Sequence, residues 1–168
     1  LYEMVLRRCK VVVVGDASWD ADATLADLGT AIRRIRVDFG IPIDFPKFEI
    51  LGRPESESKS GIYWSVGRIG YSCVDTVPGL SAEEVDGTII YLKPCYYGRE
   101  PRDVYNYARQ SAAFPHESTT DQFFSESQFE SYRALGRHVV TEAAALGVFS
   151  AVTPARRAEP SLVTPQPV

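Results

Sequence analysis

The sequence predicts an α/β fold, in which one parallel strand and an antiparallel meander are flanked by helices. Three observations predict this class. The run Val11-Val12-Val13-Val14 is wholly β-branched and apolar on both faces, as in a buried parallel strand. Residues 23–38 follow with apolar side chains at helical spacing, so that a helix, a strand, a loop and a helix succeed one another. Residues 41–93 then change to short apolar and aromatic runs between Pro- and Gly-containing loops, which is typical of antiparallel strands.

The N-terminal third supplies two helices around the valine strand. Residues 1–8 predict the first helix, with Arg7 and Arg8 in its last turn, where cations suit the helix dipole. The second helix covers residues 23–38. Asp20 or Asp22 is placed to cap its start, and Gly40 is placed to end it. The apolar faces carry Leu1, Met4 and Val5 in the first helix and Leu25, Leu28, Ile32 and Ile35 in the second.

The middle of the chain predicts short strands separated by loops. Pro42 and Pro46 restrict residues 41–50 to an edge or irregular strand, because proline lacks the N–H that a central strand needs. Further along, we expect a polar loop at 53–60, a strand at 62–71, a loop at 75–86 and a strand at 88–93.

Two more helices follow. Pro101 suits the first turn of a helix that runs through Arg109. The helix at 126–146 should begin with a capping box between Ser125 and Gln128 and a hydrophobic staple between Phe124 and Phe129. Gly147 is placed to end it. We expect this helix to bury Phe129, Tyr132, Leu135, Val139 and Ala143, and the Pro-rich tail at 149–168 to be disordered.

Size and charge limit the classes of function. The 168 residues suit a single domain, residues 1–148, with enough apolar sequence for a core. The net charge of -4 gives no basic field for nucleic acid, so we expect no such partner. Cys9, Cys73 and Cys95 are odd in number and far apart, which predicts reduced, mostly buried thiols in a reducing compartment. No apolar run reaches the roughly 18 residues that a membrane span needs.

Motifs for chemistry within this chain are missing. There is no GxSxG, P-loop or GxGxxG, and residues 79–83 (GLSAE) lack the second glycine of a nucleophile elbow. We therefore predict no catalytic residue, cofactor or metal site here. Asp16 is the best local candidate for ligand contact, since it follows a buried strand, and Asp20 and Asp22 are near enough to suggest a cation cluster. Turn formation and helix capping explain these aspartates better.

Histidines and arginines supply the other candidates. We expect His116, in a loop after Pro115, to bond to backbone, and His138 to be exposed in mid-helix without a triad partner. Arg33 and Arg34 suggest a phosphate or lipid head-group patch together with neighbouring arginines, although a solvated helix face is the commoner explanation. The candidates for ligand or head-group contact are thus Asp16, Arg33, Arg34 and His116; the patch would also include Arg7, Arg8 and Arg36. Phe114, Phe123, Phe124 and Phe129 suggest an acyl pocket, but core packing and the staple explain them better.

The chain resembles the C-terminal part of bacterial patatin-like phospholipase domains. The most specific similarity is residues 114–136, which run FPHESTTDQFFSESQFESYRALG. Other similar segments are residues 1–9 (LYEMVLRRC) with the valine strand and Asp16-Ala17, 27–38 (DLGTAIRRIRVD), 67–71 and 87–94. Because the chain starts at Leu1 within a helical pattern and without a methionine, we expect it to be a piece of a larger protein.

The resemblance implies a partial three-layer patatin-like sandwich and a Ser-Asp dyad that hydrolyses lipid esters. Serine, aspartate and oxyanion glycines would all lie upstream of Leu1, so this chain alone should be inactive. Asp86-Gly87 is followed by Thr88 at the start of a strand, and the dyad role is not carried over to it. Substrate would be a lipid or other ester bound through the upstream half, in a cytoplasmic protein or one that contacts a membrane from the cytoplasmic side. The alternative is a non-enzymatic α/β interaction module.

Overall fold

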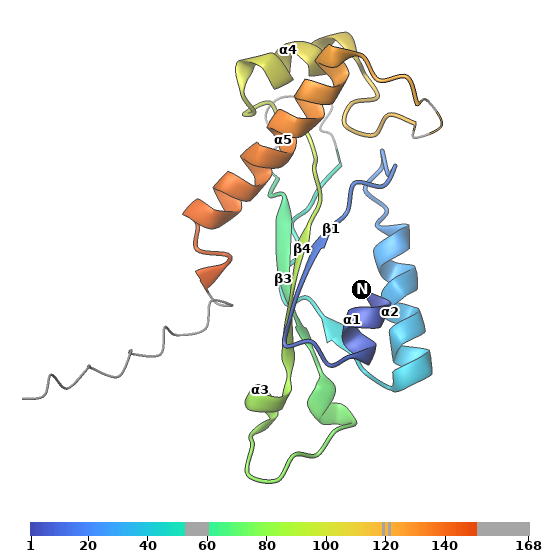
Figure 1. Ribbon diagram of the computed structural model, residues 1–168, viewed down its shortest axis with the longest axis vertical. Helices are drawn as coiled ribbons and strands as arrows, with labels where there is room; N and C mark the ends of the chain where they lie inside the picture. Colours follow the sequence, from blue (N-terminus) through green and yellow to red (C-terminus); the bar gives the residue numbers. More distant parts are fainter. Residues whose placement is uncertain (53–60, 119, 121, 151–168) are drawn as a thin grey trace, which may run out of the picture.

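The computed structural model describes residues 1–52, 61–118, 120 and 122–150. These residues form a mixed α/β structure around an open sheet with strand order β1-β4-β3-β2 (Figure 1). The α/β class predicted from the sequence is therefore confirmed. The strands are β1 (Val11–Gly15), β2 (Ile43–Asp44), β3 (Trp64–Ile69) and β4 (Gly87–Leu92).

The sheet joins one parallel pair to an antiparallel meander. β1 runs parallel to β4, with Val11 opposite Thr88 and Gly15 opposite Leu92. β4 pairs antiparallel with β3, and β3 pairs antiparallel with the short edge strand β2. The predicted parallel strand and the edge position of the proline-containing segment are both confirmed.

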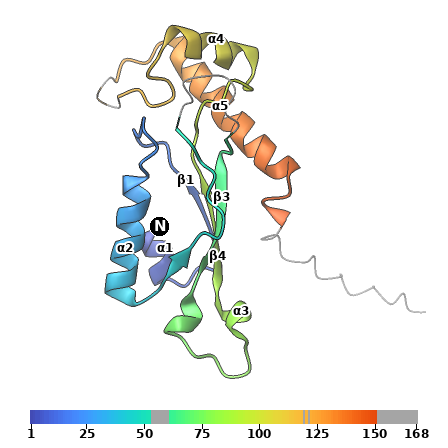
Figure 2. The ribbon, with the colours of Figure 1, turned by 180° about the vertical axis from the view of Figure 1, so that it is seen from behind.

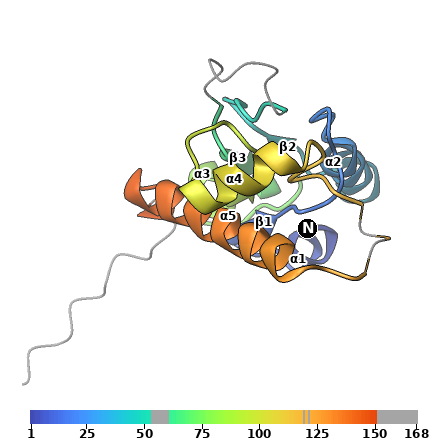
Figure 3. The same ribbon diagram turned by 90° about the horizontal axis from the view of Figure 1, so that it is seen from above.

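Helices lie on both sides of this sheet. Helices α1 and α2 cover one face, while α5 crosses the other and α4 lies beside the start of α5 (Figures 1 and 2). The view from above shows α4 and α5 packed side by side at one end of the strands (Figure 3). The bounds are α1 (Tyr2–Leu6), α2 (Ala26–Phe39), the 3-10 turn η1 (Tyr71–Cys73), α3 (Ala82–Val85), α4 (Arg102–Gln110) and α5 (Glu126–Ala145).

Successive residues of β4 belong to two different apolar clusters, because side chains point alternately to the two faces of a strand. Ile89 joins the cluster beneath α1 and α2, which contains Val5 and Ile35. Ile90 joins the larger cluster that contains Leu135 of α5 and Val104 of α4. β4 is thus the central element of the core.

The prediction that the valine strand is buried on both faces is wrong. β1 lies at the edge of the sheet, and its Val12 is buried toward α2. On the opposite face Val11 is 40% exposed and Val13 is 52% exposed. The described part of the chain therefore leaves one edge and one face of an all-valine strand open.

Helix α2 begins later than the sequence pattern indicates. Leu25, expected within the helix, is its N-cap residue and has a left-handed backbone with φ of 54°. The Asp20 carboxylate accepts hydrogen bonds from the Thr24 and Leu25 N–H groups, so Asp20 stabilises the turn before the helix. Gly40 ends the helix with φ of 69°, as predicted.

Helix α3 lies inside residues 75–86, which we expected to be a loop. Ser81 and Glu84 form a complete capping box around its single turn. Its length of four residues is too short for a periodic apolar pattern, which is why the sequence prediction missed it.

Helix α5 begins at the predicted Glu126 and ends at Ala145, one residue before the predicted end, but its first turn differs from the prediction. Ser125 is the N-cap, and its hydroxyl accepts the Gln128 N–H at 3.1 Å. The Gln128 side-chain amide donates to Glu117, and no capping box forms with Ser125. Phe129, expected in the core, is 64% exposed, whereas the inward positions of α5 are Ser131, Leu135, Val139 and Ala143. Gly147 follows the C-cap with φ of 73°, as predicted.

The three cysteines are free thiols in different environments. Cys95 is buried, Cys9 is half-buried and Cys73 is exposed, so the expectation of mostly buried thiols holds only for Cys95. The predicted polar loop at 53–60 and the tail from residue 151 lie outside the described residues.

Candidate functional site

The clearest polar site lies at the carboxyl ends of the two parallel strands. Asp16 directly follows β1 and Lys93 directly follows β4, so parallel pairing brings them together. The Lys93 Nζ lies 3.4 Å from Asp16 Oδ2 and 3.8 Å from Asp20 Oδ2. The Lys93 side chain is only 1% exposed. A buried lysine between two carboxylates forms a charge cluster. It lies at the carboxyl ends of the strands, where open α/β sheets bind ligands.

Asp16 is held as a carboxylate by several donors. The Ser18 N–H and hydroxyl donate to its Oδ1 at 2.9 and 2.6 Å, and the Tyr91 hydroxyl donates to its Oδ2. Burial opposes ionisation of Asp16, but these hydrogen bonds and the Lys93 charge lower its pKa below the ordinary value. Burial and the hydrogen bond to Asp16 together raise the pKa of Tyr91. Tyr91 is therefore a neutral donor at physiological pH.

Asp20 joins the same cluster from the loop before α2. Besides its contacts with Thr24 and Leu25, it faces Lys93. Burial opposes its ionisation, while the bonds from Leu25 and Thr24 and the Lys93 charge lower its pKa. The turn role predicted for these aspartates is therefore present and an ion pair is added to it, whereas the predicted capping role is not, because the N-cap of α2 is Leu25 and has no side-chain cap hydrogen bond. Asp22 is exposed and lies outside the cluster.

His116 lies beside this cluster and is buried. Burial and then the positive charge of Lys93 lower its pKa, which Asp20, the Ser18 carbonyl and Asp16 oppose. Within the described residues, neither ring nitrogen has a partner in hydrogen-bond geometry. The His116 N–H donates to the Ala113 carbonyl at 2.6 Å, so this residue bonds to backbone through its main chain. Its imidazole is packed against the charged cluster, with the Ser18 carbonyl near enough to favour the protonated ring.

Glu117 fixes the segment that carries His116. Its carboxylate accepts hydrogen bonds from the hydroxyls of Tyr107 and Ser111 and from the Gln128 amide. Its own N–H donates to the Tyr132 hydroxyl at 3.3 Å. Burial opposes ionisation of Glu117, but these donors lower its pKa. Because α4 and α5 both contribute donors, the segment is clamped between them.

An apolar groove of about 230 Å³ opens next to this segment. Phe124 and Phe129 line it and are mostly exposed, and Phe123 is 94% exposed. Phe114 alone of the four phenylalanines is a core residue, between the rings of Tyr107 and Tyr132. The core explanation is thus correct for Phe114 and wrong for the other three. The groove is lined by Ala17, Pro115, Glu117, Ser118, Phe124, Gln128, Phe129 and Tyr132.

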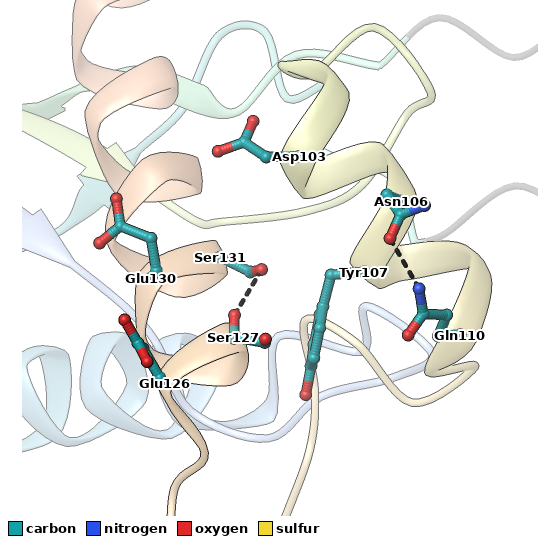
Figure 4. Close-up of a pocket in the computed structure, with 8 residues that line it drawn as sticks. All are labelled: Asp103, Asn106, Tyr107, Gln110, Glu126, Ser127, Glu130 and Ser131. Atoms are coloured by element: carbon teal, nitrogen blue, oxygen red, sulfur yellow. Dashed lines mark hydrogen bonds between the residues drawn. The ribbon is translucent and has the colours of Figure 1, made fainter.

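A second groove, of about 440 Å³, separates α4 from α5 (Figure 4). Its walls carry the carboxylates of Asp103, Glu126 and Glu130. Hydrogen bonds internal to each helix occupy some of its other polar groups, including the Gln110 amide and the Ser131 hydroxyl. Across the part of the chain that the structure describes, no three His, Cys, Asp or Glu side chains are arranged to hold a metal ion.

The predicted arginine patch does not meet the Asp16 cluster. Arg33 and Arg34 lie on the exposed face of α2, and Arg34 pairs with Asp38 at 3.5 Å. Arg8 instead binds Asp75, which follows η1. The structure therefore brings together Asp16, Asp20 and His116, and leaves Arg33 and Arg34 on a solvated helix face.

His138 was expected to be exposed, but its side chain is only 17% exposed. It contacts the Tyr63 ring edge-on, and its Nε2 lies 3.2 Å from a Glu142 oxygen. It is held within α5 and does not form a pair with His116.

Sequence reasoning missed Lys93, Tyr91 and Glu117. Lys93 follows an apolar strand, and Asp16 follows the neighbouring parallel strand. Opposite charges at these two positions could have predicted the ion pair. That signal requires knowing that β1 and β4 are neighbours, although α2, β2, β3 and α3 lie between them in the sequence. Glu117 carries no local motif, because its partners come from two different helices.

The cluster of Asp16, Asp20 and Lys93 is suited to a structural role. The Ser18 hydroxyl contacts Asp16 only two residues away, which is first explained by turn formation. The ion pairs with Lys93 connect the loop after β1 to the end of β4.

In the residues the structure describes, no helix combines the length and apolar character needed to cross a bilayer. Comparisons with protein-family models, curated proteins and solved structures found no match to this chain.

Proposed function

We propose that this chain is the C-terminal structural part of a patatin-like serine acyl hydrolase that acts on lipid esters. The Ser-Asp dyad would come from polypeptide upstream of Leu1. The single observation that carries this proposal is the open edge of β1, where Val11 and Val13 remain exposed. The sequence resemblance supplies the identity of the missing partner.

A parallel strand of this composition normally has neighbours on both edges and cover on both faces. β1 has β4 on one edge and α2 over one face. An added parallel strand would satisfy the remaining backbone groups, and its carboxyl end would lie beside Asp16. The role of this chain would then be to complete the sheet, while the Lys93 cluster holds the loops next to the reacting site.

The test is reconstitution from two chains. The DNA upstream of the codon for Leu1 is sequenced, an open reading frame there that encodes GxSxG and DG[GA] is co-expressed with this chain, and hydrolysis of a p-nitrophenyl ester is measured. We expect activity only when both parts are present. Val13→Lys should abolish it, because a charge would enter the new interface. Val37→Lys is the matched control, since Val37 is 76% exposed on α2 and lies away from the β1 edge.

Two results would contradict the proposal. Ester hydrolysis by this chain alone would place catalysis within it. Equal activity of the Val13→Lys and Val37→Lys complexes would show that the edge of β1 is not the joining surface. Both substituted side chains are exposed, so neither lysine enters the core. A difference in activity between the two complexes would therefore not result from misfolding of one variant.

The second candidate function is a non-enzymatic interaction module, which the same open edge also favours. Such a module would give a sharp, cooperative thermal melt by itself. A remainder that lacks its neighbouring strands would instead bind a hydrophobic dye or aggregate. The free thiols suit a reducing compartment in either case, and we place the protein in the cytoplasm or at the cytoplasmic side of a membrane.

A further inference from the structure

We propose that His116 is a pH-sensitive latch that controls solvent access to the cluster of Asp16, Asp20 and Lys93. In the closed state its ring is buried against this cluster. In acid the protonated ring leaves, and the cluster becomes open to solvent from the neighbouring groove. This inference concerns access to the carboxyl ends of β1 and β4, and it does not depend on the proposed acyl hydrolase function.

The His116 ring is inserted beside charges that come from two separate parts of the chain. The residue is 5% exposed, and both ring nitrogens are shielded from solvent. The charged groups that face it are Lys93, after β4, and Asp16 and Asp20, in the loop after β1. On its own segment, the Glu117 carboxylate is directed instead to donors from α4 and α5. A change of charge on the ring therefore acts directly on the cluster.

The acceptors around the ring are already used by other donors. The Asp16 carboxylate accepts hydrogen bonds from Ser18 and Tyr91, and the Asp20 carboxylate accepts them from the turn before α2. The Ser18 carbonyl, which favours a protonated ring, also faces the Lys93 Nζ at 3.5 Å. Among the described residues, no group lies in hydrogen-bond geometry to either ring nitrogen.

A protonated ring fits this place poorly. Protonation gives the imidazole a positive charge and two N–H donors, and buried charged donors without acceptors are costly. Asp16 and Asp20 attract the added charge, but burial and Lys93 outweigh them, which lowers the pKa of His116. In water the same ring is protonated below about pH 6.5. Acid therefore favours the state in which the ring has left the cluster.

The segment that carries the ring is anchored on both sides of it. Phe114 is buried between aromatic rings of α4 and α5, and Glu117 is hydrogen-bonded to both helices. Between these anchors, the backbone of His116 bonds only locally, from its N–H to the Ala113 carbonyl. The ring can therefore leave by a local movement, while α4, α5 and the sheet keep their packing.

The 230 Å³ groove provides the exit. It is lined by Ala17, which follows Asp16, and by Pro115 and Glu117, on either side of His116. Departure of the ring toward this groove would admit solvent to Lys93, whose side chain is 1% exposed in the closed state. The polar groups that become accessible lie at the carboxyl ends of strands, where open α/β sheets bind ligands.

The test is hydrogen–deuterium exchange of the full chain, followed by mass spectrometry and corrected for the intrinsic effect of pH on exchange. The reporter is the peptide with the amides of His116 and Glu117, which bond to the Ala113 carbonyl and the Tyr132 hydroxyl. A peptide from β4 reports on global unfolding. If only the open ring binds the proton, opening increases about tenfold from about pH 7.5 to about pH 5.5. We expect reporter exchange to rise by up to about this factor and β4 exchange to stay constant.

Two variants and a second readout identify the titrating group. His116→Gln keeps a polar side chain that takes up no proton, and it should abolish the pH response of the reporter. His138→Gln, which replaces the other histidine, is the matched control and should keep the response. Exchange of the imidazole C2 hydrogen of each histidine needs no substitution. For His116 in the unmodified chain, it should be slow at neutral pH and should report a pKa below the ordinary value.

Each contrary result would overturn the inference. Constant reporter exchange between the two pH values would show that the protonated ring stays in place. A pH response that persists in His116→Gln would assign it to another group. An equal rise in β4 exchange would mean that the whole sheet unfolds and that no local latch exists. Because ester hydrolysis is not measured, failure of this inference is distinguishable from failure of the proposed enzymatic function.

Discussion

At the scale of single residues, Lys93 joins the loop after β1 to the end of β4, a connection that no motif in the sequence indicated. Its side chain is buried and its ammonium faces the carboxylates of Asp16 and Asp20. Removing one partner of a buried ion pair leaves the other charge without compensation, which costs more than the intact pair contributes. The cluster should therefore respond strongly to loss of the lysine and less to loss of the whole pair.

We predict that Lys93→Met lowers the free energy of unfolding by about 3–5 kcal/mol, because two buried carboxylates lose their counter-charge. Adding Asp16→Asn to this variant should recover part of the loss. Lys47→Met is the control, since the Lys47–Glu49 pair at 2.9 Å is exposed and should matter little. Urea denaturation at neutral pH measures all three variants. Equal stability of Lys93→Met and Lys47→Met would refute the role of the cluster.

The sequence allowed half of this site to be predicted. Asp16 was identified because it follows an apolar run, and its position after β1 is confirmed. The local turn bonds of Asp16 and Asp20 follow from properties of aspartate that require no tertiary information. The burial of Lys93 and His116 does not, because it depends on which strands are neighbours and on which loop covers them.

At the scale of elements, the start of α5 shows what a local signal determines. Ser125 caps the helix as its sequence predicts, since the bond to the Gln128 N–H spans only three residues. The side chain of Gln128 was expected to complete a capping box, but it donates to the Glu117 carboxylate. An ionised acceptor that is fixed by several donors forms the stronger hydrogen bond.

We predict that Ser125→Ala destabilises the protein by about 1 kcal/mol, the usual loss for an N-cap hydroxyl. Ser127→Ala, two residues further into the helix, is the control, because Ser127 accepts the Ser131 hydroxyl through its backbone carbonyl, which the substitution keeps. The two variants can be compared by their thermal midpoints at the same pH. A larger effect from Ser127→Ala would contradict the capping assignment.

The errors at this scale share one cause. Apolar spacing gave α5 to within one residue of its end, and β-branching correctly gave β1. Both patterns also predicted burial for Phe129 and for Val11 and Val13, which are exposed. Periodicity shows that a face is suited to burial, but it does not show that the same chain covers that face.

At the scale of the whole molecule, stability should depend on pH in two ranges. The folded state lowers the pKa of His116, so the unfolded chain takes up a proton first as pH falls below about 6.5. Stability is then lost progressively toward the lower folded pKa. The carboxylates of Asp16, Asp20 and Glu117 also have lowered pKa values, and their contribution is lost below about pH 4.

We predict that His116→Gln removes the loss of stability that begins below about pH 6.5 and keeps the loss below about pH 4. His138→Gln is the control, because His138 is the other histidine of the sequence. Denaturation midpoints measured from pH 7.5 to 3.5 give the comparison. Persistence of the upper range in His116→Gln would show that a different group titrates there.

The parallel pairing of β1 with β4 also sets an order of events during synthesis. Residues 11–15 emerge before their partner at residues 88–92, which follows only after α2, β2, β3 and α3. Such a non-local contact forms late, because a long loop must close first. During that interval an uncharged, all-valine segment has no strand beside it, and such segments are prone to wrong association. β1 is therefore the segment for which the nascent chain most needs a chaperone, or a neighbouring strand that pairs with it quickly.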